Sequence, residues 1–214
     1  MKRAFWNSAL LLCSVLVAAF AFAVESPAKP DLAKGQTIAS QACAACHGTD
    51  GNSPTPANPK LAGQVAEYLE KQLHSFKAVQ GKKPERDNAV MAGMVANLSP
   101  EDMHNVAAYY ASQKAKGGVS RSRELVFVGQ KLYRAGNATT GLPACAGCHG
   151  PNGAGVPAQY PRLAGQHAEY TAAQLKTFHE GQRANDTNRM MRSIAAKMSD
   201  AEMHAVSDYI AGLR

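Results

Sequence analysis

Two short cysteine motifs contain the residues of this chain that are best suited to chemistry. They read Cys43-Ala-Ala-Cys46-His47 and Cys145-Ala-Gly-Cys148-His149. Two thiols separated by two residues can each add to a vinyl group of a haem, and the imidazole that follows can then bind the iron. The motifs therefore predict two covalently bound haem c groups per chain. The predicted thioether residues are Cys43, Cys46, Cys145 and Cys148, and the predicted iron ligands beside them are His47 and His149.

Other chemistries also use paired cysteines, and the sequence disfavours them. A zinc ribbon needs further Cys or His pairs at fixed spacing. A thioredoxin-like redox pair lies in strand-helix-strand surroundings and does not require a histidine beside it. Two disulfides would suit an exported chain, but each of these cysteines belongs to a pair that is followed at once by histidine. The fifth cysteine, Cys13, lies in an N-terminal stretch that we expect to be removed.

The N-terminal residues have the pattern of a secretory signal peptide. Lys2 and Arg3 precede an apolar run over residues 9–24, and Ala21-Phe22-Ala23 matches the site that signal peptidase reads. The run is shorter than the roughly 20 apolar residues that span a bilayer. We therefore predict that residues 1–23 are cleaved. The 21 basic and 16 acidic residues that then remain are scattered along the chain, so we expect no nucleic-acid partner.

The flanks of the two motifs repeat, which divides the mature chain into related halves. An offset of 102 residues superimposes the motifs and also places Leu61-Ala-Gly-Gln64 on Leu163-Ala-Gly-Gln166. After a two-residue deletion, an offset of 100 aligns the rest of each half. Two copies are too few for a solenoid. We predict two globular domains, residues 24–116 and 117–214, joined at the glycines and small polar residues of 116–120.

The repeat also selects a ligand for the other side of each iron. Apart from the initiator, both halves carry methionine at two aligned positions, Met91/Met191 and Met103/Met203. The second pair lies on the core side of a predicted helix, where methionine commonly fills space. The first pair lies in predicted loops, which can fold a thioether over a haem. We therefore predict Met91 and Met191 as the sixth ligands. The alternatives at neighbouring positions are Met94 and Met190.

Prolines and further histidines extend the predicted site. Pro59 and Pro161 each lie twelve residues after a motif histidine, where a carbonyl can accept the proton of the proximal imidazole and fix its ring. His104 and His204 recur in both halves and leave bis-histidine ligation open, although their positions early in a helix favour solvent-facing side chains. The histidines without a counterpart are expected on the surface: His74, His167 and His179.

Helices are the elements that must position these residues. Apolar side chains recur at three- and four-residue spacing over residues 65–76 and 170–178. Ser99-Pro100-Glu101-Asp102 is typical of a helix start, and Ser199-Asp200-Ala201-Glu202 is a capping box. Further helices that lead into the motifs are predicted at residues 32–42 and 125–133. With no convincing strand pattern, the fold class is predicted to be all-α, with each domain wrapped around a covalently bound haem.

The mature chain resembles the class I cytochromes c, and most closely the dihaem cytochrome c4 family. The resemblance rests on the paired Cys-Ala-x-Cys-His-Gly motifs, Asp50-Gly-Asn-Ser53, Pro-x-Leu-Ala-Gly-Gln in both halves, and the regions of Met91 and Met191. It implies two domains whose haems lie close together with propionates toward the interface. It also implies a periplasmic electron carrier between a quinol-oxidising cytochrome bc-type complex and a terminal oxidase or reductase, with peripheral membrane association in some members. We expect the protein to be a monomer.

The predicted coordination favours an electron carrier over an enzyme. An iron whose axial positions are both filled by protein has no open site for oxygen or peroxide, and a thioether ligand raises its potential. We therefore expect electron transfer with redox-protein partners and no catalysis. Two alternatives stay open: a small peroxidase-like dihaem oxidoreductase with one open iron, and the haem subunit of a larger enzyme.

Overall fold

The computed structural model describes residues 29–79 and 82–214. The predicted signal peptide, residues 1–23, lies outside the described residues. Within them, no helix has both the length and the apolar character that a membrane span requires.

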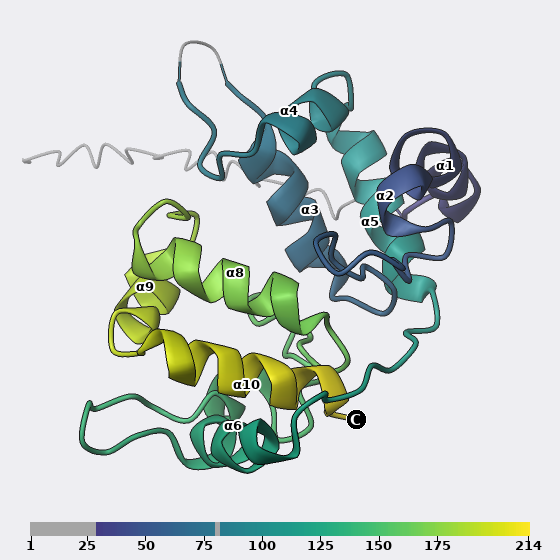
Figure 1. Ribbon diagram of the computed structural model, residues 1–214. Coiled ribbons are helices and arrows are strands. Elements are labelled where there is room, and N and C mark those ends of the chain that lie inside the picture. Colours follow the sequence, from purple (N-terminus) through teal and green to yellow (C-terminus); the bar gives the residue numbers. More distant parts are fainter. Residues whose placement is uncertain (1–28, 80–81) are drawn as a thin grey trace, which may run out of the picture.

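Both halves are built from helices (Figure 1). The first half contains α1 (Leu32–Ile38), a π-helical turn (Ala39–Cys43), α2 (Ala44–His47), α3 (Ala66–Phe76), α4 (Ala89–Val95) and α5 (Pro100–Ser112). The second half contains α6 (Arg123–Ala135), α7 (Ala146–His149), α8 (Ala168–His179), a 3-10 turn (Thr187–Arg189), α9 (Met190–Ala195) and α10 (Asp200–Gly212). Over the described ranges there is no strand, only bridges between single residues. The predicted all-α fold class is confirmed.

Capping boxes start the last long helix of each half. Ser99 Oγ accepts a hydrogen bond from the Asp102 N–H (3.1 Å), and the Asp102 carboxylate accepts one from the Ser99 N–H (3.0 Å). Ser199 and Glu202 exchange the same two bonds at the start of α10. Each box satisfies two backbone donors that a helix start leaves free. The sequence predicts only the second as a capping box, because aspartate replaces the usual Glu or Gln in the first.

A close helix crossing holds each domain together. α1 packs on α5, and α6 packs on α10. A Cβ added to Gly35 would lie 2.9 Å from the Cβ of Tyr109 and closer still to the backbone of Asn105. A Cβ added to Gly129 would collide with the backbone of Ala205 in the same way. Glycine is required at both crossings because any side chain would push the helices apart.

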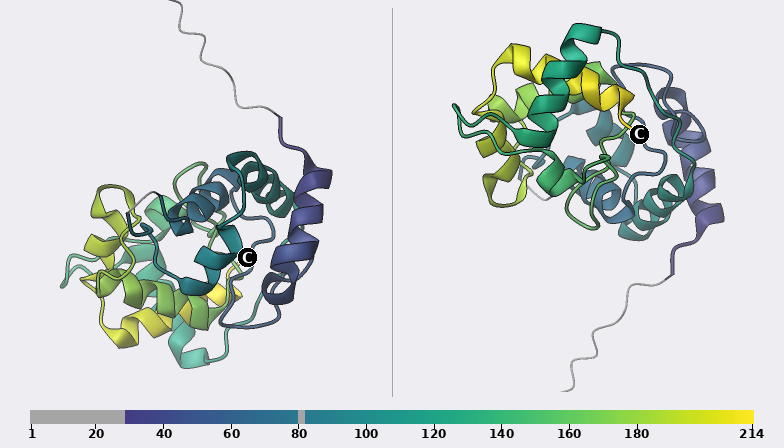
Figure 2. Two further views of the ribbon diagram at one scale, coloured as in Figure 1. Left: turned by 90° about the horizontal axis from the view of Figure 1, so that it is seen from above. Right: turned by 90° about the horizontal axis from the view of Figure 1, so that it is seen from below.

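The hydrophobic core is divided between the halves. Among the described residues, one buried cluster is drawn from the second half alone and two smaller ones from the first half alone. Figure 1 shows the corresponding units, with α3 and α8 facing each other across the boundary, and Figure 2 shows them from above and below. This division agrees with two domains, while the boundary between residues 116 and 117 stays a prediction.

The prediction that Met91 and Met191 lie in loops is wrong. Both methionines lie in the first turn of a short helix, α4 or α9. In the first domain Asn88 starts the helix, because its side chain accepts a hydrogen bond from the Met91 N–H (2.9 Å). In the second domain the chain enters α9 through Asn188 and Arg189, which have left-handed φ values of 53° and 57°. Two consecutive residues with left-handed φ values are uncommon when neither is glycine.

Candidate haem sites

A cavity of about 960 Å³ extends across the boundary between the domains and is lined by both. All four motif cysteines contribute to its wall, and none of them is joined in a disulfide. Burial raises the pKa of the Cys43 thiol and raises that of Cys145 to about 11. A redox-active Cys-x-x-Cys pair has a lowered thiol pKa instead. The thioredoxin-like alternative therefore does not fit.

His47 and His149 lie at the same cavity wall, and each is only 8% exposed. The Nδ1–H of His47 donates to the carbonyl oxygen of Pro59 at 2.9 Å, and that of His149 donates to Pro161 at 2.9 Å. A carbonyl can only accept, so Nδ1 carries the proton and Nε2 is the nitrogen with a free lone pair. Burial lowers the pKa of both imidazoles, which keeps them in the neutral form that binds metals.

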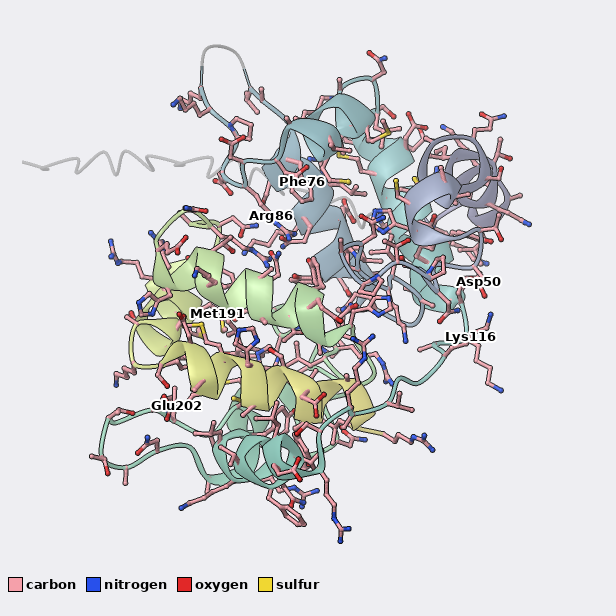
Figure 3. The ribbon with its side chains drawn as sticks, viewed as in Figure 1. Asp50, Phe76, Arg86, Lys116, Met191 and Glu202 are labelled. Carbon is pink, nitrogen blue, oxygen red and sulfur yellow. The ribbon has the colours of Figure 1, made fainter. Side chains whose placement is uncertain are left out.

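Methionines of α4 and α9 complete the wall of the cavity. Met91 and Met191 line it and are half-buried, and Figure 3 labels Met191 on α9 near α8. Met103 and Met203 do not line the cavity. They are buried in the core, with 1% and 2% of their surfaces exposed, which agrees with the prediction that this pair fills space there. Three further methionines also reach the cavity: Met94, Met190 and Met198. The choice of Met91 and Met191 over their neighbours stays a prediction.

Two buried arginines, of which Figure 3 labels Arg86, join the domains beside this cavity. Arg86, between α3 and α8, donates to Gln72 Oε1 at 2.9 Å and to Gln174 Oε1 at 2.8 Å. Arg183 donates to the same two oxygens, at 2.9 Å and 2.8 Å. The guanidinium groups lie over the rings of Phe76 and Phe178, 4.5 Å and 4.4 Å from their centres. Each arginine thus binds one glutamine of its own domain and one of the other.

The internal repeat does not reveal these arginines, because they fall outside both of its offsets. Arg86 and Arg183 are 97 residues apart, yet their backbones pair across the interface and their contacts correspond. An offset of 97, three less than the offset of 100 that holds on either side of them, would have aligned them. Two arginines in equivalent loops were the signal available in the sequence.

Comparisons with known proteins identify the family. The Cytochrome c family model matches residues 32–114 and again 128–214. Cytochrome c4 of Azotobacter vinelandii is 50% identical over 191 residues, which cover 86% of this chain and 89% of that protein. The crystal structure of reduced recombinant cytochrome c4 from Pseudomonas stutzeri superimposes with a TM-score of 0.82 at 45% identity, over 87% of this chain and all of that one. The chain belongs to the cytochrome c4 family.

A third relative carries a different name. The thiosulfate dehydrogenase electron acceptor of Stutzerimonas stutzeri is 40% identical over 182 residues, which cover 84% of this chain and 82% of that protein. With its tandem cytochrome c domains, the chain binds two covalent haem c groups and is an electron-transfer protein that works with redox partners.

The residues around the cavity fit two haem groups. Arg86 and Arg183 are 9% and 7% exposed, and in the described part of the chain no carboxylate pairs with either. A buried charge without a counter-ion is costly. Haem propionates directed toward the interface, as the family resemblance implies, would supply the missing negative charge, and the cysteines, imidazoles and thioethers of the same wall are the donors that a c-type haem uses.

The remaining histidines have other partners. His104 Nδ1 donates to the Glu70 carboxylate at 2.9 Å, and neither His104 nor His204 lines the cavity, so bis-histidine ligation is not supported. His74 and His179 are exposed as predicted, whereas His167 is only partly exposed. Its Nε2–H donates to the carbonyl of Ser53 in the other domain at 2.9 Å, a contact that only the packing of the domains creates.

Proposed function

We propose that this protein is an exported, periplasmic electron carrier whose two irons are each bound by histidine and methionine. His47 and Met91 are the ligands in the first domain, and His149 and Met191 are those in the second. The thioether links are formed by Cys43, Cys46, Cys145 and Cys148. The carrier connects a quinol-oxidising complex to a terminal oxidase or reductase, as the family resemblance implies.

One observation carries this proposal: a buried histidine and a half-buried methionine of each domain line the same cavity. The histidine is held from behind by a proline carbonyl at 2.9 Å in both domains. A thioether from the short helix α4 or α9 is available as the second axial donor. Filling both positions of each iron leaves no site for a substrate, which favours transfer over catalysis.

The protein groups have distinct tasks in electron transfer. Bound haem iron supplies one-electron oxidation and reduction. His47 and His149 donate Nε2, and their fixed rings cannot rotate away because Nδ1–H is held by a carbonyl. Met91 and Met191 contribute a soft neutral ligand that favours the reduced state. Arg86 and Arg183 place positive charge in the interface and offset the propionate charge.

Spectroscopy of the purified holoprotein tests this assignment. We expect a pyridine haemochrome value of two haem c groups per chain, a sulfur-to-iron charge-transfer band in the oxidised protein, and no carbon monoxide binding by the reduced protein at neutral pH. Ready binding of carbon monoxide at either haem would contradict the proposal and favour the peroxidase-like alternative with an open iron.

Export and oligomeric state have their own tests. N-terminal sequencing of protein from the periplasmic fraction should begin at Val24, and protein that retains residues 1–23 would contradict cleavage. Gel filtration of native extracts should give a monomer. Co-elution with a large complex would instead identify a haem subunit of an enzyme, and recovery from membranes that release the protein on washing with salt would identify peripheral association.

A thiosulfate dehydrogenase is a second candidate for the electron donor. The observation that favours it is the relative from Stutzerimonas stutzeri, which is named as the electron acceptor of that enzyme. Stopped-flow mixing of oxidised protein with either a quinol-oxidising complex or a thiosulfate dehydrogenase distinguishes the two. The donor that reduces the haems faster at physiological ionic strength is the one to assign.

A further inference from the structure

Gln64 and Gln166, the last residues of the repeated Leu-Ala-Gly-Gln sequence, bind across the domain interface. The side chain of Gln166 binds both backbone polar groups of Lys60. Its Oε1 accepts a hydrogen bond from the Lys60 N–H at 2.9 Å, and its Nε2 donates one to the Lys60 carbonyl at 3.0 Å. Gln64 holds Arg162 in the same way, at 2.7 Å and 2.9 Å. Both glutamines are only 8% exposed.

The orientation of each glutamine is determined by its surroundings. Oε1 of Gln166 also accepts from the backbone N–H of His167 at 3.0 Å, and Oε1 of Gln64 accepts from that of Val65 at 2.9 Å. Two N–H donors therefore face each oxygen, while a carbonyl faces each nitrogen. A flipped amide would oppose like groups at all three contacts.

The peptide group that Gln166 binds is the one that holds the proximal histidine of the other domain. The carbonyl of Pro59 and the N–H of Lys60 belong to a single peptide. Its oxygen accepts from Nδ1–H of His47 at 2.9 Å, and its N–H donates to Gln166. Because the peptide is conjugated, a hydrogen bond at its nitrogen makes its oxygen a stronger acceptor.

The second domain has the equivalent chain of bonds. His149 Nδ1–H donates to the carbonyl of Pro161 at 2.9 Å, and the N–H of the same peptide, that of Arg162, donates to Gln64. Each proximal imidazole is thus connected through one peptide to a glutamine of the opposite domain. A histidine that donates a stronger hydrogen bond is a more basic ligand, and a more basic ligand favours ferric iron.

We propose that Gln166 and Gln64 are positioning residues that set the redox potential of the haem in the opposite domain. Gln166 strengthens the hydrogen bond of His47 and lowers the potential of the first haem, and Gln64 does the same for His149 and the second haem. The proposal rests on His47 and His149 being the iron ligands. Its consequence is that each potential depends on the closed interface, so the two domains tune each other.

Leucine variants of the full-length holoprotein test the direction of this coupling. Gln166→Leu should raise the potential of the first haem, and Gln64→Leu that of the second. The expected change is about twofold in the ratio of reduced to oxidised haem at a fixed applied potential, which corresponds to about 18 mV at 59 mV per tenfold change. NMR during redox titration resolves the two haems. The variants are matched controls, since a local effect would move the haem of the mutated domain.

Two further readouts separate the coupling from simple loosening of the interface. The Nδ1–H proton resonance of His47 should move upfield in Gln166→Leu but not in Gln64→Leu, and that of His149 should do the reverse. Exchange of the Lys60 amide hydrogen should accelerate in Gln166→Leu alone. Equal shifts at both haems in both variants, a larger shift in the mutated domain, or no shift would each overturn the proposal.

Glutamate variants cover the case in which a leucine variant fails to mature. Gln166→Glu keeps an oxygen that accepts from the Lys60 N–H and makes it a stronger acceptor, although the hydrogen bond from Nε2 to the Lys60 carbonyl is lost. The potential of the first haem should then fall, and by more than that of the second. Gln64→Glu should lower the second more than the first. A fall that is larger within the mutated domain would assign the change to local charge and overturn the coupling. In every variant the ligation itself is checked separately by the haemochrome value and the charge-transfer band.

Discussion

Replacing Met91 and Met103 by alanine, one at a time, tests which thioether binds iron in the first domain. Both positions hold methionine in the two halves of the chain, but only Met91 lines the cavity. Met103 is 1% exposed and packs with Phe76 and Val95. The two substitutions remove the same atoms. A difference between the two variants in absorbance or stability therefore arises from where each side chain lies in the structure.

The expected effects are of different kinds. Met91→Ala should remove about half of the sulfur-to-iron charge-transfer absorbance, because one of two haems loses its thioether, and should lower the potential of that haem. Met103→Ala should keep the band but destabilise the domain. Truncation of a fully buried methionine costs about 2–5 kcal/mol, and a loss of about 3 kcal/mol lowers Tm by more than about 10 °C in a domain of this size.

Absorbance of the oxidised protein and guanidinium unfolding of each variant measure the two effects. Met191→Ala should remove the other half of the band, and the double variant Met91→Ala/Met191→Ala should remove all of it. A band that persists in Met91→Ala, or that disappears in Met103→Ala, would refute the assignment. If Met94→Ala removes the band instead, the ligand is the exposed neighbour one turn further along α4.

Three further experiments test the local explanations of the fold. Gly129→Ala should destabilise the second domain by about 1–3 kcal/mol through overpacking, measured by thermal unfolding, whereas Gly147→Ala, where an added Cβ meets nothing within 4 Å, should be neutral; equal losses would contradict the crossing argument. Ser199→Ala should cost about 1 kcal/mol by removing a cap, and unchanged denaturant unfolding would show that the capping box is dispensable. Hydrogen bonds from Ser99 lower the pKa of Asp102 from its ordinary 3.8 to about 2. Ionised Asp102 therefore contributes to the free energy of unfolding above about pH 4, and this contribution is lost as the pH falls toward 2. The difference in that free energy between the wild type and Asp102→Asn should shrink over the same interval. A difference that stays constant would contradict the lowered pKa.

The chemistry of the site was accessible from the sequence because it depends on local spacing. Cys-x-x-Cys-His places both thiols and the imidazole within one turn of chain, so the prediction of covalent haem needed no tertiary information. The internal repeat then narrowed eight methionines to two aligned pairs, and a helix pattern separated the buried pair from the cavity pair. The prediction of loops around Met91 and Met191 failed because Asn88 caps a helix of only seven residues, which is too short to give a periodic signal.

The interface between the domains depends on tertiary structure alone. The contacts that join the domains connect residues roughly 100 positions apart and are made by Gln64, Gln166, Arg86 and Arg183. Helical periodicity reports only on neighbours within a few residues, so it cannot predict such contacts. His167 shows the same limit, since its partner is a backbone carbonyl of the other domain. Residue spacing along a chain determines which groups can react with one haem, whereas the packing of two folded surfaces decides which groups of one domain act on the haem of the other.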